Sequence, residues 1–482
     1  MSLERVSLNS GFLSSLGVIY NRIVGSSTMV ILSCFMLGFS VRLIPELLSW
    51  PYPIGFDTIC YGARIKSGAI WYHWSEFFSR TWLLYAILIP IYNLIKGDPF
   101  ILLKFTAPVL YGLNACGIYY FARKGLNWDV KRSLLSVFFF VFQLASLRIS
   151  WDLYRNTLGL GILLFTLPFI KDLENRRNFM FFMALSVLVV WGHELASVIL
   201  FAVTFGVMLS DLLKGEYSHA TLPALTLFLT SVYFRVFPIR YQIYTNIIFA
   251  HDAIPACVGG IFFLVDYMRV ISPYQFYQTY IDLVLHVLSL FGLLYLLSLP
   301  LVLLGVFRNR VLDYWTLLLL VGSFSALFSP FCALNWWDRW MDMLVYPFTF
   351  YAVNGIFRLF RLCCRRGLRL GGILLAFSVL MLMVLSGFAF MSVRYENGGP
   401  FYSPYTIAYF PSTMLHNTVL LQDVEGTVKV FEWLNDHMDN RSVVLVQHAL
   451  LGWALSHLDG KLHILYYVKD VKSALNLSSE LG

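Results

Sequence analysis

The segment from Leu370 to Ser392 reads LGGILLAFSVLMLMVLSGFAFMS and contains no charged residue. A helix needs about 20 apolar residues to cross the hydrocarbon core of a bilayer, so this segment is long enough to span a membrane. Arg365, Arg366 and Arg369 precede it, which is typical of the cytoplasmic end of a membrane helix. The sequence therefore predicts an integral membrane protein.

The composition of the whole chain agrees with this prediction. Of its 482 residues, 59% are hydrophobic and only 13% are charged, which is about half the charged share of a soluble domain. The net charge of +8 does not indicate nucleic-acid binding, because most basic residues lie in short loops between apolar segments. We expect membrane lipids as partners and no nucleic acid.

About eleven apolar segments are candidates for membrane spans. They lie near residues 28–48, 99–122, 133–150, 155–170, 179–192, 195–213, 219–235, 281–306, 311–331, 340–357 and 370–392. A further apolar segment, 81–95, is short and contains Pro90, so we interpret it as interfacial or re-entrant. The predicted fold class is an all-α polytopic membrane protein.

Basic loops predict the orientation of these spans, because lysine and arginine collect on the cytoplasmic side. The strongest such loop contains Arg358, Arg361, Arg365, Arg366 and Arg369. Placing it inside, together with the other basic loops, puts these segments outside: 49–80, 151–154, 192–194, 236–280, 332–339 and everything after 393. We therefore expect a multi-pass protein of the cell membrane or an endomembrane with an extracytoplasmic C-terminus.

The last part of the chain differs from the rest because charged residues occur throughout it. Short strands are predicted at 443–446 and 463–466, and helices at 425–438 and 449–458. The sequence predicts a transmembrane domain over residues 1–394 and a small soluble α/β domain over 395–482.

Polar residues gather in the segments predicted to lie outside, where ionisable groups next to the bilayer indicate function. Four segments carry them: PYPIGFDTICYGARIKSG with Asp57, Tyr61 and Arg64; SLRISWDLYRN with Arg148, Asp152 and Arg155; WGHE with His193 and Glu194; and ALNWWDRWMD with Asp338, Arg339 and Asp342. A carboxylate there could act as a general base or bind a divalent metal. An arginine could bind a phosphate and stabilise its charge.

Each of these residues also has a structural alternative. Asp57 could cap a helix, and Asp152 could form a local pair with Arg155. His193 could equally cap a helix, and snorkelling to the headgroups would explain Arg339. Motifs of nucleotide-driven transporters, zinc proteases and serine hydrolases are missing from the sequence.

The order of these features resembles that of the GT-C superfamily, membrane glycosyltransferases that use lipid-linked sugars. Asp57 in GFDTICYGARI follows the first span, and Asp152 in SWDLYRN follows a later one. Arg339 precedes a late span in DRWMDMLVYPFTFYAVNG, and a tail with EWLNDH and LLGWALSHLDGK follows the last span. The resemblance covers most of the chain by architecture.

This resemblance implies many helices around an outward groove and a polyprenyl-phosphate-linked sugar donor. Asp57 would deprotonate the acceptor or hold a metal, Asp152 would be a second catalytic acid, and Arg339 would bind the donor phosphate. The remaining candidates are Arg155 and Arg64 for the phosphate, and Tyr61, His193, Glu194 and Asp338 for substrate. The acceptor would be a protein, lipid or glycan. A catalytically inactive scaffold and a lipid or amphiphile transporter stay open as alternatives.

Overall fold

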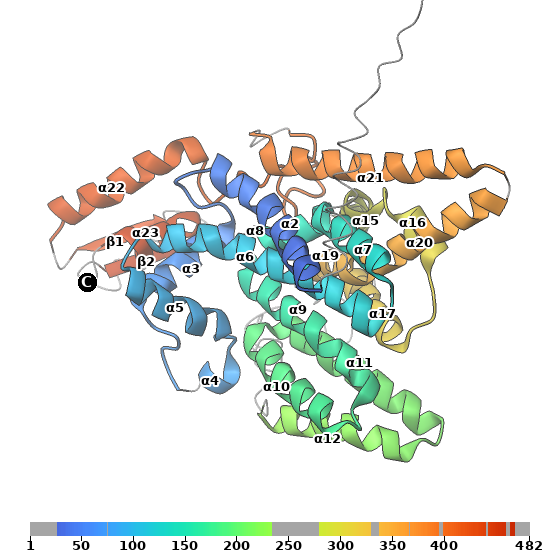
Figure 1. The fold of residues 1–482 in the computed structure, drawn as a ribbon. Coiled ribbons are helices and arrows are strands. Elements are labelled where there is room, and N and C mark those ends of the chain that lie inside the picture. The colour runs from blue at the N-terminus through green and yellow to red at the C-terminus, as the bar shows by residue number, and fades with distance from the viewer. Residues whose placement is uncertain are drawn as a thin grey trace, which may run out of the picture.

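A computed structural model describes residues 27–74, 76–233, 279–328, 337–365, 367–394, 399–439, 442–458 and 463–467. This part of the chain is mostly helical (Figure 1). Most of the predicted outward loop 236–280, and the part of loop 332–339 that precedes Trp337, lie outside the described residues.

Six described helical segments are long and apolar enough to cross a membrane. They are α2 (Ser27–Leu48), α6 (Pro99–Tyr120) continued by η1 (Phe121–Gly125), α11 (Glu194–Leu213), α17 (Arg310–Phe324) continued by η4 (Ser325–Leu327), α19 (Trp337–Met343) with α20 (Val345–Arg365), and α21 (Arg369–Ser392). This is the pattern of a multi-pass membrane protein, as the sequence predicts.

Two predicted spans are each built from two helices with a sharp bend. The angle between α7 (Val130–Val141) and α8 (Leu144–Asp152) is 62°, and between α15 (Tyr280–Tyr295) and α16 (Leu299–Gly305) it is 77°. We expected one span at 133–150 and one at 281–306, and the structure divides both. Pro300 near the start of α16 explains the second break, because proline cannot donate the backbone hydrogen bond of a continuous helix. In the first, Gln143 has an extended backbone conformation that ends α7.

The other predicted spans correspond to shorter helices. These are α9 (Tyr154–Thr166), followed by η2 (Leu167–Asp172), α10 (Arg176–Gly192) and α12 (Tyr217–Tyr233), with 13, 17 and 17 residues in the three α-helices. The total of eleven crossings therefore stays a prediction. The apolar segment 81–95 forms α5 (Leu83–Ile95), which at about 20 Å is too short to cross about 30 Å of hydrocarbon.

The tail contains the predicted strands and helices. It forms η5 (Leu421–Asp423), α22 (Val424–His437), β1 (Val443–Gln447), η6 (His448–Leu450), α23 (Leu451–His457) and β2 (His463–Tyr467), and the two strands pair in parallel. Figure 1 shows α22, α23, β1 and β2 at one end of the molecule beside α3 (Phe56–Ser67), with α5 and then the short α4 (Glu76–Ser79) below them. The tail thus lies next to the segment that carries Asp57.

A shared hydrophobic cluster joins the tail to α3, α5 and α6. Phe431 and Trp453 of the tail belong to the same buried cluster as Ile59 and Leu84. A Cβ atom at Gly452 of α23 would lie only 2.9 Å from Cγ2 of Ile59, so this glycine permits the close approach to α3. Whether residues 395–482 form a separate domain stays a prediction.

Candidate functional site

The position of Asp57 follows from the way α3 begins. Gly55 precedes the helix with φ +93°, a conformation that favours glycine. Its amide donates to the carbonyl of His416 at 2.8 Å. A Cβ atom there would lie 2.6 Å from the carbonyl oxygen of Trp151 and 2.8 Å from Cβ of Asp152. The start of α3 therefore packs directly against the end of α8, which brings Asp57 and Asp152 into one region.

The Asp57 side chain lies in the first turn of α3 and is half-buried. Within the described residues its carboxylate forms no hydrogen bond and no ion pair, so it does not cap the helix. Burial raises the pKa of Asp57, and the charge of Asp152 raises it further, while Arg339, Arg155 and Arg148 oppose this effect. A carboxylate with a raised pKa near charged groups is a candidate general base.

Asp152 is held by Arg148 and not by Arg155. The Nη1 atom of Arg148 lies 2.7 Å from Oδ1 of Asp152, and its Nε donates to the carbonyl of Tyr409 at 2.8 Å. The sequence places Arg148 in the same outward segment as Asp152 but does not indicate a role for it. Its spacing of four residues from Asp152 was the signal for this pair, because residues four apart are neighbours on a helix.

Arg155 instead faces Glu194. Its Nη1 donates to Oγ1 of Thr81 at 3.0 Å and lies 4.0 Å from Oε1 of Glu194, and the Thr81 hydroxyl donates to that same oxygen at 3.0 Å. His193 precedes α11, where its Nδ1 accepts a hydrogen bond from the Leu195 amide at 3.2 Å. Of the two roles considered for His193, the structure shows the capping role.

Arg64 and Tyr61 are further along α3. Arg64 forms an ion pair with Glu76 at 3.1 Å and donates to the carbonyl of Ile70 at 2.9 Å. Tyr61 is 4% exposed and stacks on Tyr154, with ring centroids 5.5 Å apart. Arg64 therefore has a protein carboxylate as its partner, and Tyr61 is part of the packed interior.

Helix α19 contributes a second set of charged residues. Arg339 is half-buried and acts electrostatically on Asp57 and Asp342. Within the part of the chain that the structure describes, it forms no hydrogen bond and no ion pair. Asp342 is 2% exposed and interacts with Arg148, Asp338 and Asp152. Asp338 is half-buried in the first turn of the helix. The sequence places Asp342 in the same outward segment as Arg339 but does not indicate a role for it.

These contacts separate the charged groups into paired and unpaired ones. Arg148 and Arg155 have carboxylate partners in the protein, whereas Asp57 and Arg339 have no direct polar partner among the described residues. An unpaired arginine can bind an anion bidentately, and an unpaired carboxylate can accept a proton. The arrangement suits proton removal beside a bound phosphate.

Within the described residues, no group of three or more His, Cys, Asp and Glu side chains could hold a metal ion. The carboxylate of Asp152 acts electrostatically on Asp57 and is itself paired with Arg148. The unpaired carboxylate of Asp57 is suited to accept a proton.

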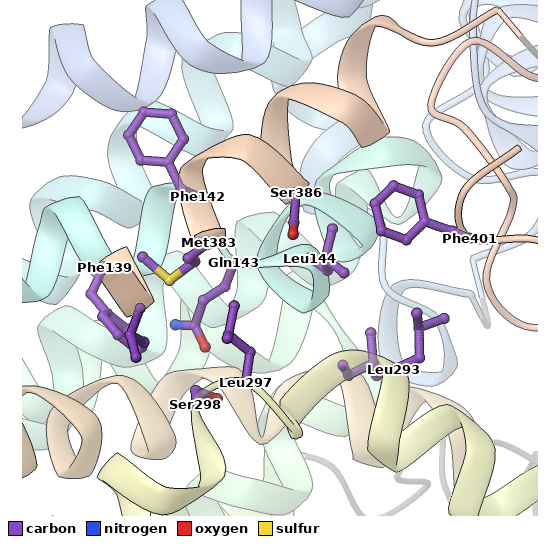
Figure 2. Close-up of a pocket in the computed structure, with 12 residues that line it drawn as sticks. Phe139, Phe142, Gln143, Leu144, Leu293, Leu297, Ser298, Met383, Ser386 and Phe401 are labelled. Carbon is purple, nitrogen blue, oxygen red and sulfur yellow. The ribbon is translucent and has the colours of Figure 1, made fainter. Parts of the chain in front are cut away.

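An apolar cavity of about 150 Å³ lies at the two helix breaks (Figure 2). Gln143 and Leu144 line it from the α7–α8 break, and Leu297 and Ser298 from the α15–α16 break. Nε2 of Gln143 donates to Oγ1 of Thr349 at 2.8 Å. Helix α8 leads from this cavity to Asp152 over nine residues, or about 13 Å. The cavity and the carboxylate of Asp152 therefore lie at the two ends of α8.

Comparison with known proteins does not assign a function to this site. No protein-family model matches the sequence, and no curated protein matches it. The function must therefore be inferred from the residues themselves.

Proposed function

We propose that this chain is a membrane glycosyltransferase of the GT-C type, which transfers a sugar from a polyprenyl-phosphate-linked donor to an acceptor on the extracytoplasmic face. The observation that supports it is that a possible base and a possible phosphate-binding residue lie in the same region. The carboxylate of Asp57 is half-buried and interacts electrostatically with Arg339. Neither side chain has a direct polar partner among the described residues.

In this proposal Asp57 acts on the acceptor and Arg339 acts on the departing phosphate. Asp57 removes the proton from the acceptor's nucleophilic atom, which forms a bond to the anomeric carbon of the sugar. The bond between that carbon and the phosphate oxygen breaks, and the lipid phosphate leaves with the electron pair. Arg339 stabilises the negative charge that develops on the phosphate.

The paired residues would have supporting roles. Arg148 holds the carboxylate of Asp152, and Thr81 and Glu194 hold the guanidinium of Arg155. Because Arg148 and Arg155 each face a carboxylate, Arg339 is the cation of this set that is available to an anionic donor. The apolar cavity at Gln143 offers space for hydrocarbon of the donor lipid about 13 Å from Asp152.

The test uses the full chain in lipid vesicles with a panel of polyprenyl-phosphate sugars. We expect Asp57→Asn to lower kcat by about 10²- to 10⁴-fold, because proton removal contributes an effect of that size. Arg339→Gln should weaken donor binding and slow the reaction, whereas Glu425→Gln, which changes an exposed acid of the tail, should leave both unchanged.

Two results would contradict the proposal. Transfer by Asp57→Asn at the native rate would remove the base from the mechanism. Movement of lipid across the vesicle membrane, with no cleavage of the sugar–phosphate bond by the native chain, would instead identify a transporter.

A further inference from the structure

A second cavity lies at the opposite end of α6 from the candidate site. It has a volume of about 840 Å³ and is lined by Ile31 and Phe35 of α2, Leu113 and Tyr120 of α6, and Phe165 of α9. The site end of α6 is marked by Phe100, against which Gly62 of α3 packs. The 22 residues of α6 separate the two ends by about 33 Å. The cavity is therefore distinct from the site around Asp57.

The walls and the end of this cavity differ in chemistry. Its walls are mostly apolar side chains, and Ile31 and Leu113 are 47% and 41% exposed. At its end, α6 changes into the π-helical turn η1, with the sequence FARKG, which carries Arg123 and Lys124. The cavity is thus an apolar groove with two cations at one end.

These two cations are available to a ligand. Lys124 is exposed and has no hydrogen bond or ion pair with any residue that the structure describes. Arg123 is half-buried and donates from Nη1 to the carbonyl of Trp128, a neutral partner. Neither cation is neutralised by a carboxylate of the described residues, so an anion at this position would be attracted by both.

We infer that this groove binds a phospholipid with an anionic headgroup, whose acyl chain lies along α2 and α6 and whose phosphate contacts Arg123 and Lys124. Charge complementarity favours this occupant: basic pockets between membrane helices on the cytoplasmic side bind anionic headgroups. The volume falls within the range of about 300 to 1,000 Å³ that is usual for ligand sites. A zwitterionic lipid would fill the apolar part but would gain less from the two cations.

The experiment compares two lipids with the same acyl chains, phosphatidylglycerol and phosphatidylcholine, on the purified full chain in detergent. Lipid retained by the protein is counted by native mass spectrometry, and the thermal unfolding midpoint is recorded with each lipid. We expect phosphatidylglycerol to bind more tightly and to raise the midpoint. Each removed cation should weaken its binding about fivefold, since a basic residue near an anionic surface contributes about 1 kcal/mol.

Matched variants separate the groove from other basic regions. Lys124→Gln should reduce the preference for phosphatidylglycerol about fivefold, and the double variant with Arg123→Gln should lose it. Arg361→Gln, in the basic segment at the end of α20, should keep it. Leu113→Trp, which fills the groove with a larger side chain, should lower the binding of both lipids.

Three results would overturn the inference. The first is equal affinity of the native chain for the two lipids. The second is an unchanged preference in the Lys124→Gln and double variants. The third is a photo-crosslinker at Leu113 that captures the chain's own first 26 residues in place of added lipid.

Discussion

At the scale of single residues, the site is defined by which charges are paired. The charged residues of the site differ in this respect: Asp152 is bound by Arg148, whereas Asp57 and Arg339 have no direct polar partner among the described residues. The types and the order of the charged residues were visible in the sequence. Their pairing depends on distances across α3, α8, α9 and α19, which spacing along the chain does not determine.

The raised pKa of Asp57 predicts a pH dependence of stability. Burial and the charge of Asp152 make its ionised form less favourable in the folded protein than in the unfolded chain. Between the ordinary pKa of aspartate and the raised value, the folded state holds the proton that the unfolded state has lost, so stability falls as pH rises through this window. Asp57→Asn should remove this decrease of folding stability with rising pH. Unfolding midpoints measured from pH 4 to pH 7 should decline less in the variant, and identical slopes would contradict the prediction.

The buried carboxylate of Glu46 on α2 predicts a large effect on stability. Glu46 is 2% exposed and lies 2.8 Å from Nη1 of Arg42 and 3.1 Å from Nζ of Lys104. Arg42 also donates to the carbonyl of Ser150 at 3.2 Å, two residues before Asp152. Glu46→Gln would leave two buried cations without their carboxylate, which costs about 3 to 5 kcal/mol in unfolding free energy.

The control for this prediction is a pair with the same spacing on the surface. Glu425 and Lys429 are four residues apart on α22, as Arg42 and Glu46 are on α2, but both are exposed. Glu425→Gln should leave the unfolding midpoint almost unchanged. Equal losses in the two variants, measured by thermal unfolding in detergent, would show that the buried group has no special role.

At the scale of elements, close contacts between helices decide the packing. Helix α16 lies against α20 so closely that a Cβ atom at Gly305 would be 1.7 Å from the carbonyl oxygen of Tyr351, and one at Gly355 would be 1.9 Å from that of Leu301. Asn354 also donates to the carbonyl of Gly305 at 2.5 Å. Small residues at such crossings let helix backbones approach within a membrane.

These contacts predict that Gly305→Ala is destabilising. The added methyl group would force α16 away from α20, and overpacking of this kind costs about 1 to 3 kcal/mol or more. Gly371→Ala on α21 is the matched control, because a Cβ atom there has no neighbour within 4 Å. The unfolding midpoint should fall for the first variant only. If both behave alike, the close approach of α16 and α20 is not important for stability.

At the scale of the whole molecule, orientation in the membrane connects the site with its surroundings. The proposed outer face contains α3, on which Cys60 is exposed, and the opposite face contains the basic end of α20, on which Cys364 is exposed. The two cysteines therefore report on the two sides. Cys34 and Cys116 are buried and serve as internal negative controls.

The orientation predicts which cysteine reacts from which side. In single-cysteine variants in sealed cells, a membrane-impermeant maleimide added outside should label Cys60 and leave Cys364 unlabelled until the membrane is permeabilised. Variants that retain only Cys34 or Cys116 should react slowly in both conditions. Labelling of Cys364 from outside would invert the orientation and would place Asp57 on the cytoplasmic side.

The sequence by itself determined the membrane class, the tail's strands and helices, and the order of the charged segments. These features depend on the length of apolar segments, the periodicity of hydrophobic residues and the local composition, all of which can be read from the sequence. Only the tertiary structure decided that two predicted spans are bent, that Arg148 holds Asp152, and that Glu46 lies between Arg42 and Lys104. Pairing and bending depend on which helices touch. Contacts between residues as distant as Glu46 and Lys104 are set by the packing of the whole bundle and leave no periodic signal in the sequence.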